Sequence, residues 1–206
     1  MTNPPEPPDE HLVSLSKDGN LDAFNRLVDR YQSAVYSLCF RLLGERTAAE
    51  DAAQEAFLAA YRGLARFQEG SFRSWLFRIA VNQARDELRR RGRRPRTDSL
   101  TPRDDPEAPA FDPADPAPGP AESLDHAALS AELERALLQL PFDQRQAVLL
   151  SDLHGFAYDE IAAMTRTSLG TVKSRIFRGR ERLRAIVSRN PELFGRLHRP
   201  DQRGDP

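Results

Sequence analysis

One segment near the C-terminal end carries side chains that suit the reading of DNA bases. Residues 158–187 consist of a short apolar stretch, a tight turn and a longer basic stretch, which is the spacing of a helix-turn-helix. Any antiparallel helix pair can imitate this spacing, but the density of cations on the second helix favours DNA, because Arg and Lys donate to guanine edges in a major groove. The second helix would present these residues: Thr171, Lys173, Ser174, Arg175, Phe177 and Arg178.

A second basic segment, which begins at Arg66, interleaves arginines with aromatic residues. Such a segment can follow a phosphate backbone and stack unpaired bases. The aromatic residues Phe67, Phe72 and Trp75 match an apolar stripe, so we expect them in the core rather than under bases. Asn82 lies on the cationic face, where nothing requires its burial, and is the better candidate for reading a base.

An acidic cluster precedes this basic segment and comprises Glu50, Asp51, Gln54 and Glu55. Carboxylates in a first helical turn are ordinarily solvated and interact favourably with the helix dipole. The alternative is a contact with a protein partner that has a basic surface. The sequence leaves both interpretations open.

The residues of metal sites and enzymes are scarce. The one cysteine, Cys39, can form neither an internal disulfide nor a thiolate metal site alone, and we expect it in a buried helix position. No phosphate-binding glycine loop or nucleophile motif occurs. We therefore expect no catalytic residue, no cofactor and no metal. The histidines share no metal-ligand spacing: His11, His126, His154 and His198.

The charges are segregated along the chain, although the formal net charge is only −1. Residues 70–96 and residues 165–189 each have a net charge of +7, whereas residues 97–126 have −7. Two basic blocks separated by an acidic one predict two contacts with polyanions. Only 2 of the 30 basic residues are lysine, which favours bidentate arginine contacts with phosphates and bases, although a coding bias would give the same count.

The expected fold is all-α, because no alternating strand pattern appears. Residues 95–120 hold 8 of the 16 prolines and predict a flexible acidic linker between two small helical domains. No run of 18 apolar residues occurs, and the acidic, proline-rich N-terminus is unlike a secretory signal, so a cytoplasmic protein is expected. The predicted division is a disordered segment 1–10, a domain 11–94, a linker 95–122, a domain 123–189 and a tail 190–206.

Three helices are expected in the first domain. Asn20 should cap a helix that ends at Gly44, Thr47 and Glu50 should form a capping box, and Ser71 should cap the third helix. The expected core faces are Leu21, Phe24, Leu27, Val28, Tyr31, Val35, Leu38 and Leu42, then Phe57, Tyr61 and Leu64, then Phe72, Trp75, Leu76, Ile79, Ala80 and Leu88.

The second domain should open with an apolar helix that stops at Pro141, followed by a helix over about 143–154 that Gly155 closes. The helix-turn-helix should then comprise helices over 159–164 and 169–187. Its core should join Ile161 and Ala162 to three residues of the second helix: Leu169, Val172 and Ile176.

Three segments, in this order and split by such a linker, resemble the extracytoplasmic-function sigma factors of bacterial RNA polymerase, the small type with only regions 2 and 4. AAEDAAQEAFLAAYRGL (48–64) is similar to the family's helix that binds core polymerase. FRSWLFRIAVNQARDELRRRGRR (72–94) is similar to its helix for melting and reading the −10 element, and YDEIAAMTRTSLGTVKSRIFRGRERLR (158–184) to its −35 reader.

The resemblance implies roles for residues as well as a function: binding core polymerase, recognising both promoter elements, melting the −10 region and directing initiation. It implies the polymerase β′ and β subunits and promoter DNA as partners, with an anti-sigma factor common in the family and no membrane contact. The implied core-binding residues are Glu50, Asp51, Gln54, Glu55 and Phe57. Those for the −10 element are Arg78, Asn82 and Arg85, and those for the −35 element are Thr171, Lys173, Ser174, Phe177 and Arg178.

Two positions depart from this pattern or admit another interpretation. The family's turn commonly has glycine where this chain has Arg166, and a positive φ there would cost arginine about 1 kcal/mol; alternatively, Arg166 reaches a phosphate. Phe177 fits a core position by spacing. The rival functions are a DNA-binding regulator without a polymerase role, which leaves the first domain unexplained, a polymerase-binding decoy that cannot open promoters, and an enzyme.

Overall fold

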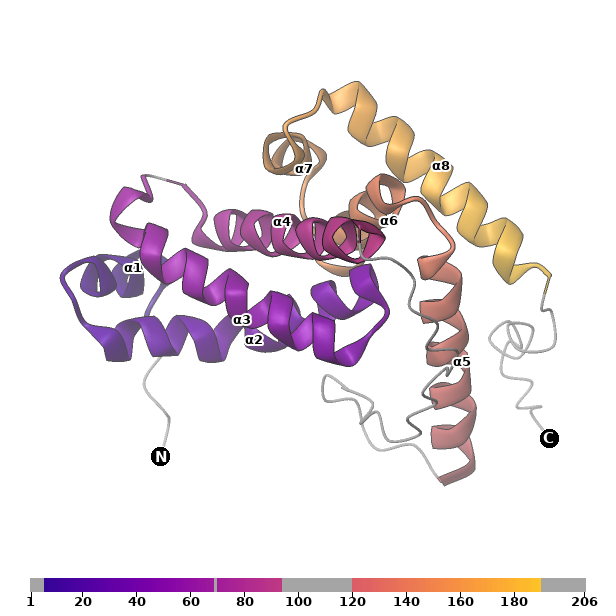
Figure 1. Cartoon of the computed structure of the whole chain (residues 1–206), viewed down its shortest axis with the longest axis horizontal. Coiled ribbons are helices and arrows are strands. Elements are labelled where there is room, and N and C mark those ends of the chain that lie inside the picture. Colours follow the sequence, from indigo (N-terminus) through magenta and orange to yellow (C-terminus); the bar gives the residue numbers. More distant parts are fainter. Residues whose placement is uncertain (1–5, 69, 94–119, 190–206) are drawn as a thin grey trace, which may run out of the picture.

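The computed structural model describes residues 6–68, 70–93 and 120–189 (Figure 1). Within these ranges the regular structure is helical and no strand occurs, which confirms the all-α prediction. Most of the predicted linker and the whole C-terminal tail lie outside the described residues. The elements are α1 (Asp9–Lys17), α2 (Leu21–Leu43), α3 (Arg46–Gly63), η1 (Leu64–Arg66), α4 (Phe72–Arg93), α5 (Pro120–Leu138), α6 (Phe142–Val148), η2 (Leu149–Leu153), α7 (Tyr158–Thr165) and α8 (Leu169–Val187).

Two of the predicted helix caps in the N-terminal unit (α1–α4) are confirmed. The Asn20 side chain accepts a hydrogen bond from the Ala23 amide at 3.0 Å, and the Ser71 hydroxyl accepts one from the Ser74 amide at 3.1 Å. The predicted Thr47–Glu50 capping box is wrong. Because Glu45 is already extended directly after the Gly44 turn, α3 starts at Arg46 and Thr47 lies inside its first turn.

The core face of α3 differs from the predicted stripe. Tyr61 is 46% exposed and Phe57 only partly buried, although Leu64 is buried. Small side chains let α2 and α4 approach α3 closely, so the large residues are placed at the edges of this packing. The buried residues of α3 are all alanines: Ala48, Ala49, Ala52, Ala53, Ala56 and Ala60.

Helix α1 was not predicted, and it begins at Asp9, two residues before the expected domain boundary. Leu12 and Val13 are buried against the rest of the unit. The Asp9 carboxylate accepts hydrogen bonds from Arg30 and from the Tyr31 hydroxyl, both on α2. These contacts fix a short helix whose apolar residues, Leu12, Val13 and Leu15, pack on the core from one face.

The C-terminal unit (α5–α8) contains the expected helix-turn-helix, with α8 at the predicted bounds. Ile161, Val172 and Ile176 are buried as predicted, but Leu169 is 43% exposed because it is the first residue of α8, at the turn. Helices α6 and α8 pack closely at Gly179, where a Cβ would lie 2.6 Å from Val148 Cγ2.

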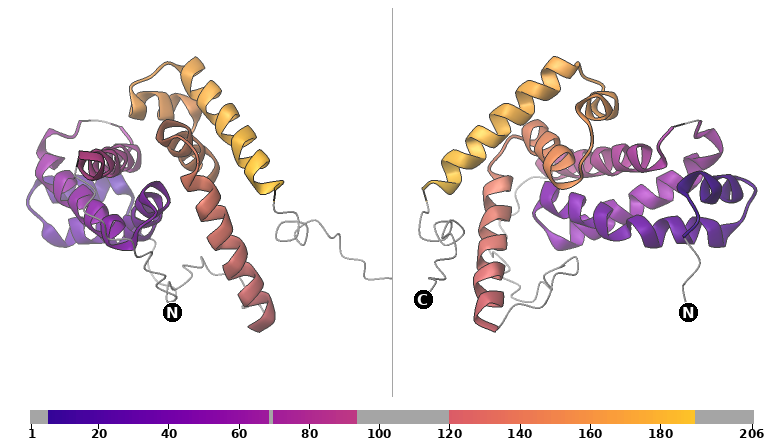
Figure 2. Two further views of the ribbon diagram at one scale, coloured as in Figure 1. Left: turned by 45° about the vertical axis from the view of Figure 1, so that its right-hand side comes forward. Right: turned by 180° about the vertical axis from the view of Figure 1, so that it is seen from behind.

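The two units pack against each other. Helices α6 and α7 lie over α4, and α5 runs past the end of α2 (Figures 1 and 2). Phe77 of α4 is fully buried here, with ring centroids 5.0 Å from Phe156 and 4.9 Å from His154. The predicted apolar stripe of α4 did not include Phe77, because its partners belong to the other unit.

Candidate nucleic-acid interface

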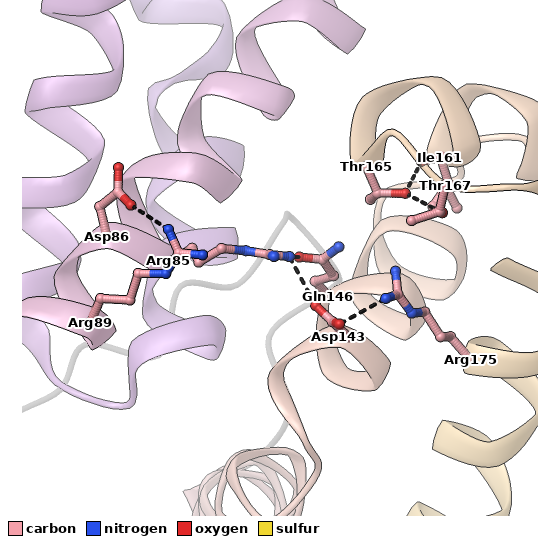
Figure 3. A network of polar contacts seen from close by, with 9 residues as sticks. All are labelled: Arg85, Asp86, Arg89, Asp143, Gln146, Ile161, Thr165, Thr167 and Arg175. Atoms are coloured by element: carbon pink, nitrogen blue, oxygen red, sulfur yellow. Dashed lines mark hydrogen bonds and ion pairs between the residues drawn. The ribbon is translucent and has the colours of Figure 1, made fainter. Parts of the chain in front are cut away.

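The turn between α7 and α8 is built from short polar contacts. Arg166 ends α7 with φ 52°, so the positive φ considered from the sequence is present. The Thr165 hydroxyl donates to the Ile161 carbonyl at 2.7 Å and lies 2.9 Å from the Thr167 hydroxyl (Figure 3). The Ser168 hydroxyl then caps α8 by accepting from the Thr171 amide at 3.1 Å. This turn fixes the angle at which α8 leaves α7.

Beyond Leu169 at its first position, the N-terminal half of α8 exposes the side chains of Lys173, Phe177 and Arg178. Phe177 is 67% exposed, which removes the core interpretation of this residue. Thr171 and Ser174 are half-buried, and the Ser174 hydroxyl donates back to the Thr171 carbonyl. Arg175 is directed elsewhere, toward α6, because its guanidinium pairs with the Asp143 carboxylate at 2.8 Å.

The proposed base-reading residues of α4 lie in different surroundings. Asn82 is exposed, as expected, and Arg78 is half-buried. The Arg85 guanidinium donates to Asp143 and to the Gln146 side-chain oxygen, at 2.9 Å each (Figure 3). It also lies over the Phe142 ring, 4.9 Å from its centroid. Arg85 is thus engaged by the C-terminal unit, whereas Asn82 is open to solvent.

A cavity of about 550 Å³ lies beside these residues. Phe67 and Trp75 contact each other at its wall, with ring centroids 4.9 Å apart and ring planes tilted by 41°, and both are half-buried. Lys17 of α1 donates to the Phe67 carbonyl at 2.6 Å and so holds the α3–α4 connection in place. Sequence reasoning missed Lys17 because α1 was not predicted. The cavity is lined by Arg66, Phe67, Gln68, Gly70, Ser71, Ser74, Trp75 and Arg78 of one unit and Glu160, Ala163 and Met164 of the other.

The acidic cluster of α3 is solvent-exposed. Asp51, Gln54 and Glu55 line a groove between α3 and α4, whereas Glu50 is placed outside it and pairs with Arg46 at 3.8 Å. Phe57 is half-buried against the core. The rest of the groove is formed by Ala52 of α3 and by five residues of α4, of both charges: Gln83, Asp86, Glu87, Arg90 and Arg93.

Among the described residues, no cluster of three or more His, Cys, Asp or Glu side chains could hold a metal ion. Cys39 is buried, as predicted, and burial raises the pKa of its thiol to about 12. The thiol is therefore protonated and inert at neutral pH. None of the helices in the described ranges combines the length and apolarity needed to cross a membrane.

Comparison with known protein families matches both units in order. The family model described as Sigma-70 region 2 matches residues 27–94, and that described as Sigma-70, region 4 matches residues 130–183. The RNA polymerase sigma-H factor of Pseudomonas aeruginosa is 39% identical over 174 residues, covering 84% of this chain and 90% of that protein. The ECF RNA polymerase sigma-E factor of Escherichia coli K12 is 41% identical over 174 residues, covering 84% and 91%.

Two solved structures with a similar fold are complexes. CnrH bound to the cytosolic domain of CnrY superposes with a TM-score of 0.65 at 27% identity, covering 88% of this chain and 98% of that one. The sigma factor RpoE bound to the anti-sigma factor NepR, from Bartonella quintana, gives a TM-score of 0.63 at 28% identity, covering 80% and 96%.

Proposed function

Since the chain belongs to the extracytoplasmic-function sigma factors, which act as non-catalytic subunits of RNA polymerase in promoter-specific transcription initiation, we propose that it recognises a two-part promoter through two separate surfaces. In this proposal α8 reads the −35 element as duplex, and α4 with the adjoining cavity reads and opens the −10 element. The protein then acts in the cytoplasm, where polymerase and promoter meet.

The −35 surface is the exposed N-terminal half of α8. Lys173 and Arg178 can donate to guanine edges or phosphates, and the Phe177 ring can contact a thymine methyl group. Thr171 and Ser174 add hydroxyls on the same half of the helix. Helix α7 and the polar turn support this surface by fixing the direction of α8.

The −10 surface is the face of α4 around Asn82, which is itself exposed. An amide can pair with the edge of an unstacked base, and Arg78 and Arg85 flank it to bind phosphates. Extruding a base costs a few kcal/mol, so melting requires the further contacts that polymerase supplies. The wall of the nearby cavity that the N-terminal unit supplies offers the half-buried rings of Phe67 and Trp75 beside Arg66 and Arg78, which is the chemistry that holds an unstacked strand.

The polymerase-binding surface is the acidic edge of α3. Glu50, Asp51, Gln54 and Glu55 are exposed, and we assign them, with the half-buried Phe57, to contact with the polymerase β′ subunit. Their charge complements a basic partner surface, and the α3–α4 groove gives that partner a concave contact. A further contact with the β subunit is part of the same proposal.

The observation that carries the proposal is the separation of two exposed readers on two units, Asn82 on α4 and Lys173 with Arg178 on α8. The test is run-off transcription with sigma-free core polymerase on a library of promoter fragments. We compare the wild type with Asn82→Ala, with Lys173→Ala plus Arg178→Ala, and with the control Arg182→Ala, an exposed cation beyond the reading half of α8.

We expect discrete starts that need this protein. Asn82→Ala should change the −10 preference alone, the double variant should weaken the −35 preference alone, and Arg182→Ala should leave both preferences intact. Core binding without any start would instead favour a decoy. Neither core binding nor starts would favour a regulator that works without polymerase.

An anti-sigma partner is the second part of the proposal. The similar Bartonella quintana sigma factor was solved with the anti-sigma factor NepR, so we infer a partner of this class. Co-purification of the full chain with a protein that abolishes the run-off starts would support it.

A further inference from the structure

The contact between the two units covers part of the face of α4 to which the −10 strand is assigned above. We propose that the docked arrangement is a closed state, in which the C-terminal unit weakens the binding of single-stranded DNA to α4 by engaging Arg85, although Asn82 stays exposed. The α3 and α8 surfaces stay free in this state, and Asp143 is the residue that holds it closed. This inference rests on the proposed role of α4.

Asp143 of α6 joins the two helices that are assigned to DNA. One carboxylate oxygen accepts from Arg85 of α4 at 2.9 Å, and the other accepts from Arg175 of α8 at 2.8 Å (Figure 3). Gln146, one turn further along α6, adds a second acceptor for Arg85 at 2.9 Å. These hydrogen bonds occupy Nη2 of each arginine, and the carboxylate offsets part of the positive charge that would attract a phosphate.

The other end of the contact involves α7. The Glu160 carboxylate accepts from the Ser74 hydroxyl at 3.0 Å, and it belongs to the wall of the cavity beside Trp75. A carboxylate at this wall repels DNA phosphates. Arg73 is engaged as well: it donates to the His154 carbonyl, and its guanidinium lies 4.1 Å from the centroid of the Phe156 ring.

The composition of this interface suits reversible opening. Several buried polar atoms have no hydrogen-bond partner among the described residues, including Arg85 Nε, Gln146 Nε2 and His154 Nε2. Each such atom loses its hydration without a hydrogen bond in return, which weakens docking. DNA phosphates or water would satisfy these groups after undocking, so a modest competing interaction can open the contact.

Docking leaves the other two assigned surfaces open. The acidic residues of α3 are exposed, as are Lys173, Phe177 and Arg178 of α8. Polymerase can therefore bind the closed form, and a duplex can reach α8. The closed form therefore has a lowered affinity mainly for single-stranded DNA, so the free protein would bind exposed single-stranded DNA weakly.

The test compares Asp143→Asn with Asp152→Asn in the full chain. The first change weakens the carboxylate pairs to Arg85 and Arg175, whereas the second removes the same charge from a pair with Arg180 inside the C-terminal unit. Opening is read without DNA, from acrylamide quenching of Trp75, the single tryptophan, and from the radius of gyration by X-ray scattering. Binding is read with a fluorescein-labelled random-sequence single-stranded 16-mer and with its duplex.

If the closed form makes up four-fifths or more of the free protein, opening it should tighten single-strand binding by about 5-fold or more. We expect this gain, more Trp75 quenching and a larger radius for Asp143→Asn, with a gain in single-strand affinity that exceeds any gain in duplex affinity from the released Arg175. Asp152→Asn should behave as the wild type in quenching, radius and single-strand binding. Equal quenching and equal single-strand affinity in all three proteins would overturn the inference.

A covalent cross-link between the two units provides a second test, which applies even if Asp143→Asn fails to fold. Ser74 and Ala163 line the same cavity from opposite units, so Ser74→Cys plus Ala163→Cys can be bridged by a cleavable bis-maleimide, while the native Cys39 is buried. Bridging should weaken 16-mer binding relative to the unbridged protein, and cleavage should restore it. If the bridged protein binds the 16-mer as well as the cleaved one, docking is not a block. That result would leave the promoter-reading proposal intact, because the run-off assay tests it separately.

Discussion

At the scale of single residues, one non-glycine residue of the described chain has a positive φ. Arg166 has φ 52° and ψ 47° at the end of α7, where the backbone must reverse before Ser168 caps α8. A Cβ in this conformation crowds the following carbonyl, which costs about 1 kcal/mol. Arg166 is exposed, so its side chain brings no core packing to offset that cost.

We predict that Arg166→Gly raises the free energy of unfolding by about 0.5–1 kcal/mol, because glycine adopts this conformation without a clash but adds freedom to the unfolded chain. Urea unfolding followed by circular dichroism measures the change. An unchanged or lower stability would show that the arginine makes a compensating contact. A loss of duplex affinity in the same variant would identify Arg166 as a phosphate contact.

At the scale of elements, α4 presents three faces with different neighbours. Leu76, Ala80 and Ala84 face the core of the N-terminal unit, Phe77 and Arg85 face the C-terminal unit, and Asn82 faces solvent. This explains why its predicted stripe was only partly right. If α4 is assumed to have one apolar face, Phe77 lies outside that face. The helix has a second apolar face, which contacts the C-terminal unit and carries Phe77.

The packing of α6 on α8 gives the prediction at this scale. A Cβ at Gly179 would lie 2.6 Å from Val148 Cγ2 and 3.3 Å from the Gln144 carbonyl, so Gly179→Ala should destabilise the chain by about 1–3 kcal/mol. Gly92→Ala is the matched control: it adds the same methyl group to α4 in open space and should be neutral or stabilising by up to about 1 kcal/mol. Thermal unfolding of both variants measures this, and equal effects would argue against the close α6–α8 approach.

At the scale of the whole molecule, the sequence predicted the features that depend on residues close together in the chain. The caps at Asn20 and Ser71, the bounds of α8 and the exposure of Asn82 all depend on neighbouring residues or on one helical face. The contact between units depends on side chains far apart in the sequence, such as Arg85 with Asp143, 58 positions on, and no local pattern records such a pairing. The alanine face of α3 was missed for another reason, since alanines give a weak apolar signal.

The docked arrangement also predicts a response to acid. His154 lies at the contact, and burial, helped by the charges of Arg73 and Arg41, lowers its pKa to about 4. The undocked imidazole should titrate near its ordinary value of about 6.5. Between these values the undocked form binds more protons, so the docked form is fully favoured above about pH 6.5 and weakens as the pH falls toward 4.

Trp75 quenching measured from pH 7.5 to pH 4 should therefore rise below about pH 6.5 in the wild type. The variant His154→Gln removes the imidazole and keeps Asp143 and Glu160, the two carboxylates that cross the contact, so the rise below about pH 6.5 should disappear. If both proteins give the same profile, protonation of His154 is not coupled to docking.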